Sequence, residues 1–98
     1  MEISEFQRHI KEIYFDNDSK RGKEKTFIWL IEEIGELAKE IRKSDKKNEA
    51  MEAEFADVFA WLCSEANLYG IDIEKCVINK YENGCPKCRK NPCECNIK

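Results

Sequence analysis

The sequence predicts an all-α protein: a four-helix, antiparallel bundle-like domain over residues 1–84, followed by a short cysteine-rich tail over residues 85–98. Apolar residues recur at helical spacing in four segments, and no segment alternates with the period of two that a half-buried strand shows. Short polar or glycine-containing joints separate these segments, which favours antiparallel packing of neighbouring helices. The 98 residues are enough for one small hydrophobic core.

The first helix is expected over residues 3–15, where isoleucines and aromatic residues recur every three or four positions. Ser4 and Gln7 have the form of a capping box at its start. The run DNDSKRG over residues 16–22 is polar and turn-prone and ends in glycine, so we expect a loop there.

Three further helices complete the predicted domain. They are expected over residues 23–42, over residues 48–69, and from residue 73 to residue 81 or 82. Ser44 or Asn48 can cap the third helix and Asp72 the fourth, because a short polar side chain there accepts a hydrogen bond from the first turn. Gly70 and Gly84 follow these two helices, where a glycine commonly ends a helix.

The charge distribution excludes some classes of protein. The formal net charge is −3, and the charged residues, 38% of the chain, are of mixed sign with no basic face. This pattern argues against nonspecific binding to a nucleic acid backbone. The opening stretch MEISEFQRHIKE carries charges throughout, so we expect neither a signal peptide nor a membrane span, and the cytoplasm is the default location.

The second predicted helix separates apolar from acidic residues. At about 100° per residue, its apolar positions share an arc of roughly 40° to 160° measured from Glu33, which is predicted to face the core. These positions are Phe27, Leu30, Ile31, Ile34, Leu37, Ala38 and Ile41. The opposite edge carries Trp29, Glu32, Glu33, Glu36 and Glu40. Because like charges at these spacings repel, the acidic row is either a solvated face or a cation-binding edge.

The third predicted helix is apolar almost all round and is therefore expected to be buried. It nevertheless carries Glu54 and Asp57, three residues apart on one face. A buried, unpaired carboxylate costs several kcal/mol unless it is protonated, paired or bound to a metal. Antiparallel packing of the second and third helices would bring this pair to Glu33 and Glu36. Four carboxylates without histidine suit Mg²⁺ or Mn²⁺, and Mg²⁺ commonly completes its shell with substrate phosphates.

At this point the sequence resembles the MazG-type all-α nucleoside triphosphate pyrophosphohydrolases. The resemblance rests on E-E-x-x-E at residues 32–36 and E-x-x-D at residues 54–57. Around these lie D-S-x-R-G at residues 18–22, T-F-x-W-L-x-E-E-x-G-E-L at residues 26–37 and A-N-x-x-G-I-D at residues 66–72. The resemblance extends from the first helix to Tyr81. It implies hydrolysis of the α–β phosphoanhydride of a nucleoside triphosphate, as in nucleotide house-cleaning, and assembly as a homodimer or a dimer of dimers.

The resemblance also implies roles for individual residues. The metal ligands would be Glu33, Glu36, Glu54 and Asp57, with Glu32 as a further ligand or a water-orienting group. Trp29 could stack on the nucleobase, and Arg21, Asn67 and Lys80 could contact phosphate or sugar. Many family members carry several basic residues on the fourth helix, whereas here it offers only Lys75 and Lys80.

The tail contains four cysteines in the pattern C-x2-C-x4-C-x-C: Cys85, Cys88, Cys93 and Cys95. Three interpretations remain open at the sequence level: a structural zinc clip, a disulfide or redox pair, and a mobile tail with free thiols. The four-residue gap is short for a zinc ribbon, and the segment has too few apolar residues to fold unaided. As an alternative function, the chain would be a noncatalytic helical module that binds a protein or nucleic acid partner through this tail.

Overall fold

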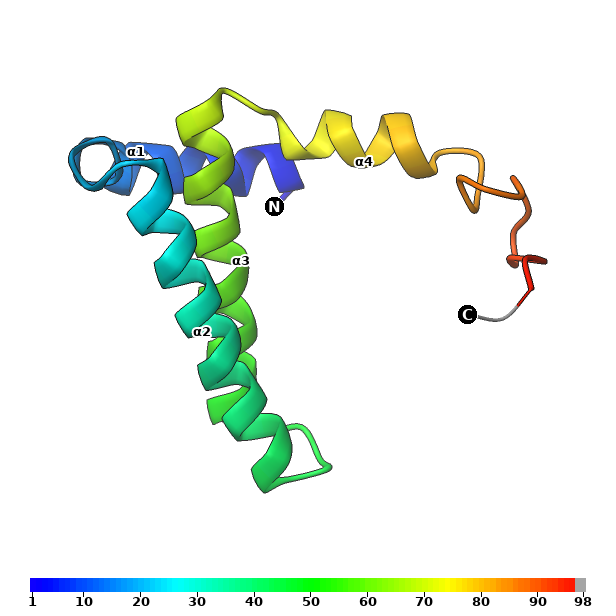
Figure 1. Cartoon of the computed structure of the whole chain (residues 1–98), viewed down its shortest axis with the longest axis horizontal. Coiled ribbons are helices and arrows are strands. Elements are labelled where there is room, and N and C mark those ends of the chain that lie inside the picture. Colours follow the sequence, from blue (N-terminus) through cyan, green and yellow to red (C-terminus); the bar gives the residue numbers. More distant parts are fainter. Residues whose placement is uncertain (97–98) are drawn as a thin grey trace.

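The computed structural model describes residues 1–96, and the four helices in this range confirm the predicted all-α class (Figure 1). Their bounds are α1 Ile3–Arg21, α2 Lys23–Lys43, α3 Glu49–Tyr69 and α4 Ile73–Tyr81. The side chains of Asn48 and Asp72 cap α3 and α4, by accepting hydrogen bonds from the N–H groups of Met51 and Lys75. Gly70 ends α3 in the left-handed conformation, with φ of 68°.

The end of α1 differs from the prediction. Residues 16–22 were expected to form a loop, but the helix continues to Arg21 and only Gly22 interrupts it. One reason is the spacing of Asp18 and Arg21, whose side chains form an ion pair of 2.8 Å along one face of the helix. Gly22 then turns the chain at a φ of 90°, and its N–H donates to the carbonyl oxygen of Asp18.

The start of α1 also differs. Glu2 and Glu5 form the capping box, in place of the expected Ser4 and Gln7. Gln7 is buried and connects α1 to the joint between α3 and α4. Its side-chain amide donates to the Asn67 side chain at 3.0 Å and accepts from the N–H of Ile73 at 2.9 Å.

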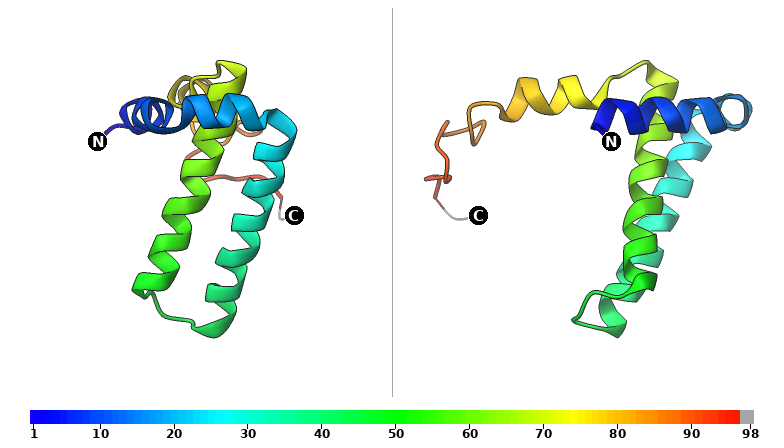
Figure 2. Two further views of the ribbon diagram at one scale, coloured as in Figure 1. Left: turned by 90° about the vertical axis from the view of Figure 1, so that its left-hand side faces the viewer. Right: turned by 180° about the vertical axis from the view of Figure 1, so that it is seen from behind.

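The helices form an antiparallel pair crossed by a third helix. α2 and α3 run side by side in opposite directions, and α1 lies across one end of the pair (Figure 2). Phe6 of α1 stacks on Phe59 of α3, with ring centroids 5.5 Å apart. α4 packs against α1 and leads away from the pair toward the tail (Figure 1). None of the helices in residues 1–96 has the length and apolar character needed to cross a membrane.

The core is smaller than the sequence suggested. The apolar stripe of α2 was expected to face it, but only Leu30 is buried, whereas Phe27 and Ile31 are each 50% exposed. The expectation that α3 is buried all round is also wrong, because Phe55 and Leu62 lie on the surface. The physical reason is that each helix of the pair has a single partner helix along most of its length (Figure 2). The outer apolar side chains therefore stay exposed.

Candidate active site

The antiparallel pairing of α2 and α3 brings together carboxylates from both helices. One oxygen each from Glu33, Glu54 and Asp57 lies within 4.8 Å of the other two. A carboxylate oxygen of Glu54 is buried without a hydrogen-bond partner. Burial, followed by the charges of Asp57, Glu54 and Glu36, raises the pKa of Glu33. Such a cluster is electrostatically unfavourable unless a cation neutralises it.

The other two acidic residues of the predicted set lie beside this cluster. Glu36 is not one of the three converging carboxylates, and its side chain pairs with Lys39 at 3.7 Å on the surface. This ion pair is exposed and therefore weak. Because its charge still contributes to the raised pKa of Glu33, Glu36 is a near neighbour of the cluster. Glu32 is exposed on the same helix.

The donor set fits a hard divalent cation. Glu33, Glu54 and Asp57 supply only oxygen atoms, which Mg²⁺ and Mn²⁺ prefer to nitrogen or sulfur. The unpartnered oxygen of Glu54 is the kind of buried acceptor that a bound cation satisfies. Three protein ligands would leave coordination positions for water and for phosphate oxygens.

A cavity of about 200 Å³ adjoins the cluster, with Asp57 in its lining. α1 contributes Asp18 and Arg21 to its wall, and α3 contributes Trp61 and Ser64. The cavity therefore places a cation and an indole ring next to a member of the acidic cluster. This composition suits an anionic ligand with an aromatic part.

An ordered stack forms the cationic wall of the cavity. The guanidinium carbon of Arg21 lies 4.8 Å from the centroid of the Trp61 ring, and Trp61 stacks on Trp29 at 6.0 Å. Arg21 also donates to Asp18 at 2.8 Å and to Thr26 at 3.3 Å. These contacts hold the guanidinium plane in one position.

Sequence reasoning assigned no site role to Asp18 and Trp61, although both line the cavity. Asp18 is 1% exposed and keeps one oxygen without a partner. The sequence feature that could have indicated Asp18 is its spacing of three residues from Arg21. This spacing brings the two side chains together only if residues 16–21 are helical.

Two of the expected substrate contacts lie elsewhere. Asn67 is buried between α1 and α3, where its amide group exchanges hydrogen bonds with Gln7. Lys80 lies on α4, which points away from the α2–α3 pair (Figure 1). Its ammonium lies over the ring of Tyr81. Within the described chain, neither residue lines the cavity next to Asp57. Arg21 does, and Trp29 lies behind Trp61 in the stack.

Together, these features define a class of protein: a small all-α protein whose antiparallel helix pair carries an acidic cluster suited to a divalent cation, beside a cavity with an arginine and an indole. Residues 21–89 match the family model of the MazG nucleotide pyrophosphohydrolase domain. Since the match spans well over half of the 98 residues, the chain belongs to this family. The matched range contains α2, α3, α4 and the first two cysteines of the tail. A search of curated proteins finds no match.

Proposed function

We propose that the protein hydrolyses the α–β phosphoanhydride of a nucleoside triphosphate, releasing the monophosphate and pyrophosphate. The observation that supports this most strongly is the convergence of Glu33, Glu54 and Asp57 next to a cavity that carries Arg21 and Trp61. Family membership supports the same reaction class. A role in clearing unwanted nucleotides from the cellular pool follows as part of the proposal.

In this proposal Glu33, Glu54 and Asp57 hold Mg²⁺ or Mn²⁺. When bound, the ion lowers the pKa of a coordinated water and neutralises charge on the phosphates. Glu36, one turn further along α2, would be the fourth ligand. To reach the metal, its exposed side chain would give up only the weak ion pair with Lys39. Glu32 orients the attacking water or adds a further ligand from the solvent side of the same helix.

The cavity wall supplies the binding groups for the nucleotide. Arg21 presents a fixed guanidinium to phosphate oxygens, and its attachment to Asp18 keeps that charge at the cavity wall. Trp61, held between Arg21 and Trp29, gives the cavity wall an aromatic surface against which a nucleobase can pack. In this arrangement the metal held by the carboxylates and the guanidinium of Arg21 would both act on the phosphates, and Trp61 would contact the nucleobase.

We also propose that the active protein is a homodimer or a dimer of dimers. Several large apolar side chains along α2 and α3 are about half exposed in one chain, including Ile28 at 59%, Ile34 at 44% and Phe55 at 55%. Exposed apolar surface of this extent is typical of a protein interface. A second copy would cover it. In such an assembly Lys80 and Asn67 remain candidate substrate contacts, with Lys80 approaching from a neighbouring subunit.

The test is pyrophosphate release from a panel of ribo- and deoxyribonucleoside triphosphates, with Mg²⁺, with Mn²⁺ and with chelator. We expect metal-dependent release, with one or a few nucleotides clearly preferred. Glu54→Gln should abolish it, and Glu52→Gln, an exposed neighbour on α3, should not. Absence of release from every nucleotide by a folded, metal-binding protein would contradict the proposal and favour the noncatalytic interaction module.

A further inference from the structure

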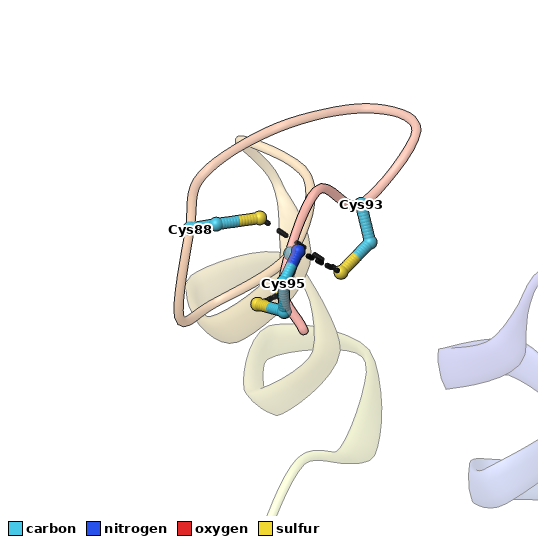
Figure 3. A group of neighbouring side chains, drawn as sticks. Cys88, Cys93 and Cys95 are labelled. Carbon is cyan, nitrogen blue, oxygen red and sulfur yellow. Dashed lines mark hydrogen bonds between the residues drawn. The ribbon is translucent and has the colours of Figure 1, made fainter. Parts of the chain in front are cut away.

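The cysteine-rich tail forms a cluster of its own at the far end of α4. The sulfur atoms of Cys85, Cys88, Cys93 and Cys95 all lie within 4.8 Å of one another. Three of them are shown in Figure 3, where side chains from separate parts of one loop point toward a common centre. We propose that these four cysteines bind one Zn²⁺ in a closed tetrahedral site that folds the tail. This inference is independent of the proposed hydrolysis.

The distances between sulfur atoms fit a tetrahedral zinc site. Four thiolates at the usual Zn–S distance of about 2.3 Å occupy the corners of a tetrahedron with edges of about 3.8 Å. In the tail, the Sγ atoms of Cys85 and Cys95 lie 3.7 Å apart, and those of Cys88 and Cys93 lie 3.8 Å apart. A disulfide would need about 2.05 Å. The sulfur atoms are therefore gathered without being bonded to each other.

Hydrophobic packing does not account for this convergence. Residues 82–96 contain no aliphatic or aromatic side chain apart from two prolines. The loop contains only a few backbone hydrogen bonds, such as that from the N–H of Arg89 to the carbonyl oxygen of Cys85 at 2.7 Å. A segment of this composition needs another source of folding free energy, and a metal ion bound by four thiolates supplies one.

The backbone of the loop is arranged to support thiolates. The N–H of Glu94 donates to the sulfur of Cys88 at 3.3 Å. The N–H of Cys95 donates to the sulfur of Cys93, also at 3.3 Å (Figure 3). Outer hydrogen bonds of this kind orient metal ligands and stabilise their charge. Lys87, Arg89 and Lys90 lie in the same loop and offset the negative charge that four thiolates retain around a divalent ion.

The short gap between Cys88 and Cys93 is accommodated by a tight backbone crossing at Gly84. Its φ is 93°, and a β-carbon placed there would lie 2.7 Å from the carbonyl oxygen of Lys90. The crossing is held by a hydrogen bond of 3.0 Å from the N–H of Cys85 to the same carbonyl. Because the site provides four sulfur ligands, it has no open position for substrate, and we assign it a structural role.

The first test is the metal content of the full chain purified without chelator. We expect about one zinc per chain in the wild-type protein. Cys88→Ser should weaken zinc binding by more than the roughly 10- to 100-fold loss that follows removal of an outer partner of a ligand. Cys76→Ser is the matched control, since Cys76 is an exposed cysteine on α4 outside the cluster, and it should keep its zinc.

A thiol titration gives an independent readout. Cys76 is exposed and should react at once, whereas Cys63 is buried and burial raises its pKa to about 11, so it should stay unreactive at neutral pH. The four tail thiols should become reactive only when zinc is removed. Exchange of zinc for cobalt should give the absorption bands of a tetrahedral tetrathiolate complex.

Gly84→Ala tests the geometry while keeping every cysteine. The added methyl group should weaken zinc retention against a competing chelator, whereas Gly35→Ala, where a β-carbon meets nothing within 4 Å, should not. The inference is overturned by tail thiols that react freely in the wild-type protein as purified, by a disulfide in the tail, by iron in place of zinc, or by full zinc retention in Cys88→Ser.

Discussion

Neutralising Glu33 should stabilise the metal-free protein, because burial disfavours its charge and the charges of Asp57 and Glu54 repel it. At the 4.8 Å limit of the cluster, each pair of carboxylates repels by about 0.9 kcal/mol in a dielectric close to that of water. The water-like value is appropriate since Glu33 is only partly buried. Two such pairs lead us to expect that Glu33→Gln raises the free energy of unfolding by about 1–2 kcal/mol in chelator.

The assay is urea denaturation of the wild-type protein and Glu33→Gln at neutral pH, with chelator and then with saturating Mg²⁺. The advantage of the variant should shrink in high salt, which screens charge repulsion. It should also shrink as the pH falls: the folded state holds the Glu33 proton more tightly than the unfolded state, so the wild-type protein gains stability from this group on acidification. Mg²⁺ should stabilise the wild-type protein more than the variant.

The matched control is Glu52→Gln, which removes an exposed carboxylate from α3 and should change the free energy of unfolding by less than about 0.5 kcal/mol. Two results would refute the reasoning. One is a destabilised Glu33→Gln in chelator, which would mean that the side chain makes favourable contacts in the absence of metal. The other is equal stabilisation of the wild-type protein and the variant by Mg²⁺.

Three further predictions concern the cavity wall, the α1–α3 contact and the outer face of α2. Arg21→Ala leaves the buried carboxylate of Asp18 without its ion-pair partner, so we expect a loss of about 3 kcal/mol in denaturant unfolding, the lower end for a buried pair because Arg21 is partly exposed. The loss should be largely recovered in Arg21→Ala/Asp18→Asn, and no recovery would contradict the pairing. Gln7→Ala leaves buried partners unpaired, including the N–H of Ile73, and should cost about 1–3 kcal/mol. Faster hydrogen exchange at the start of α4 would accompany this loss, and unchanged exchange there would argue against it. Ile31→Glu places a charge on the half-exposed face of α2 and should shift the protein toward the monomer in light scattering while the helix content is kept. A wild-type protein that is already monomeric at high concentration would contradict the proposed assembly.

The acidic cluster could be predicted because two simple rules combine in it. A spacing of three residues places Glu54 and Asp57 on one face of α3, and a short joint makes α2 antiparallel to α3, so Glu33 meets them. The position of Glu36 could not be predicted in the same way. The Glu36 side chain can either join the cluster or pair with Lys39. Which of the two it does depends on its conformation and on whether a cation is bound.

The end of α1 was not predicted because local turn propensity pointed the wrong way. Asp, Asn, Ser and Gly in residues 16–22 favour a turn when judged individually. The helix is instead supported by the Asp18–Arg21 ion pair and by the contacts of Arg21 with Thr26 and Trp61 on other helices. Tertiary contacts of this kind are invisible to a reading of local propensity.

The outer apolar faces show a second limit of sequence patterns. The apolar stripe on α2 indicates that residues such as Phe27 and Ile31 favour burial. It does not indicate whether they are buried by the same chain or by another one. The structure shows that residues 1–96 leave both side chains half exposed. The tail shows a related limit. The spacing of its cysteines does not by itself indicate that the backbone turns at Gly84 and that the four sulfur atoms lie close together.

The central claim is that the carboxylate cluster is a catalytic metal site, and the most direct test is pyrophosphate release by Asp57→Asn beside the wild-type protein and Glu52→Gln. All three would be compared at saturating Mg²⁺ with the nucleotide that the wild-type protein prefers. We expect Asp57→Asn to lose more than about 100-fold in rate, since even the loss of an outer partner of a metal ligand costs roughly 10- to 100-fold. Glu52→Gln should keep the wild-type rate. A folded Asp57→Asn with wild-type turnover would contradict the assignment.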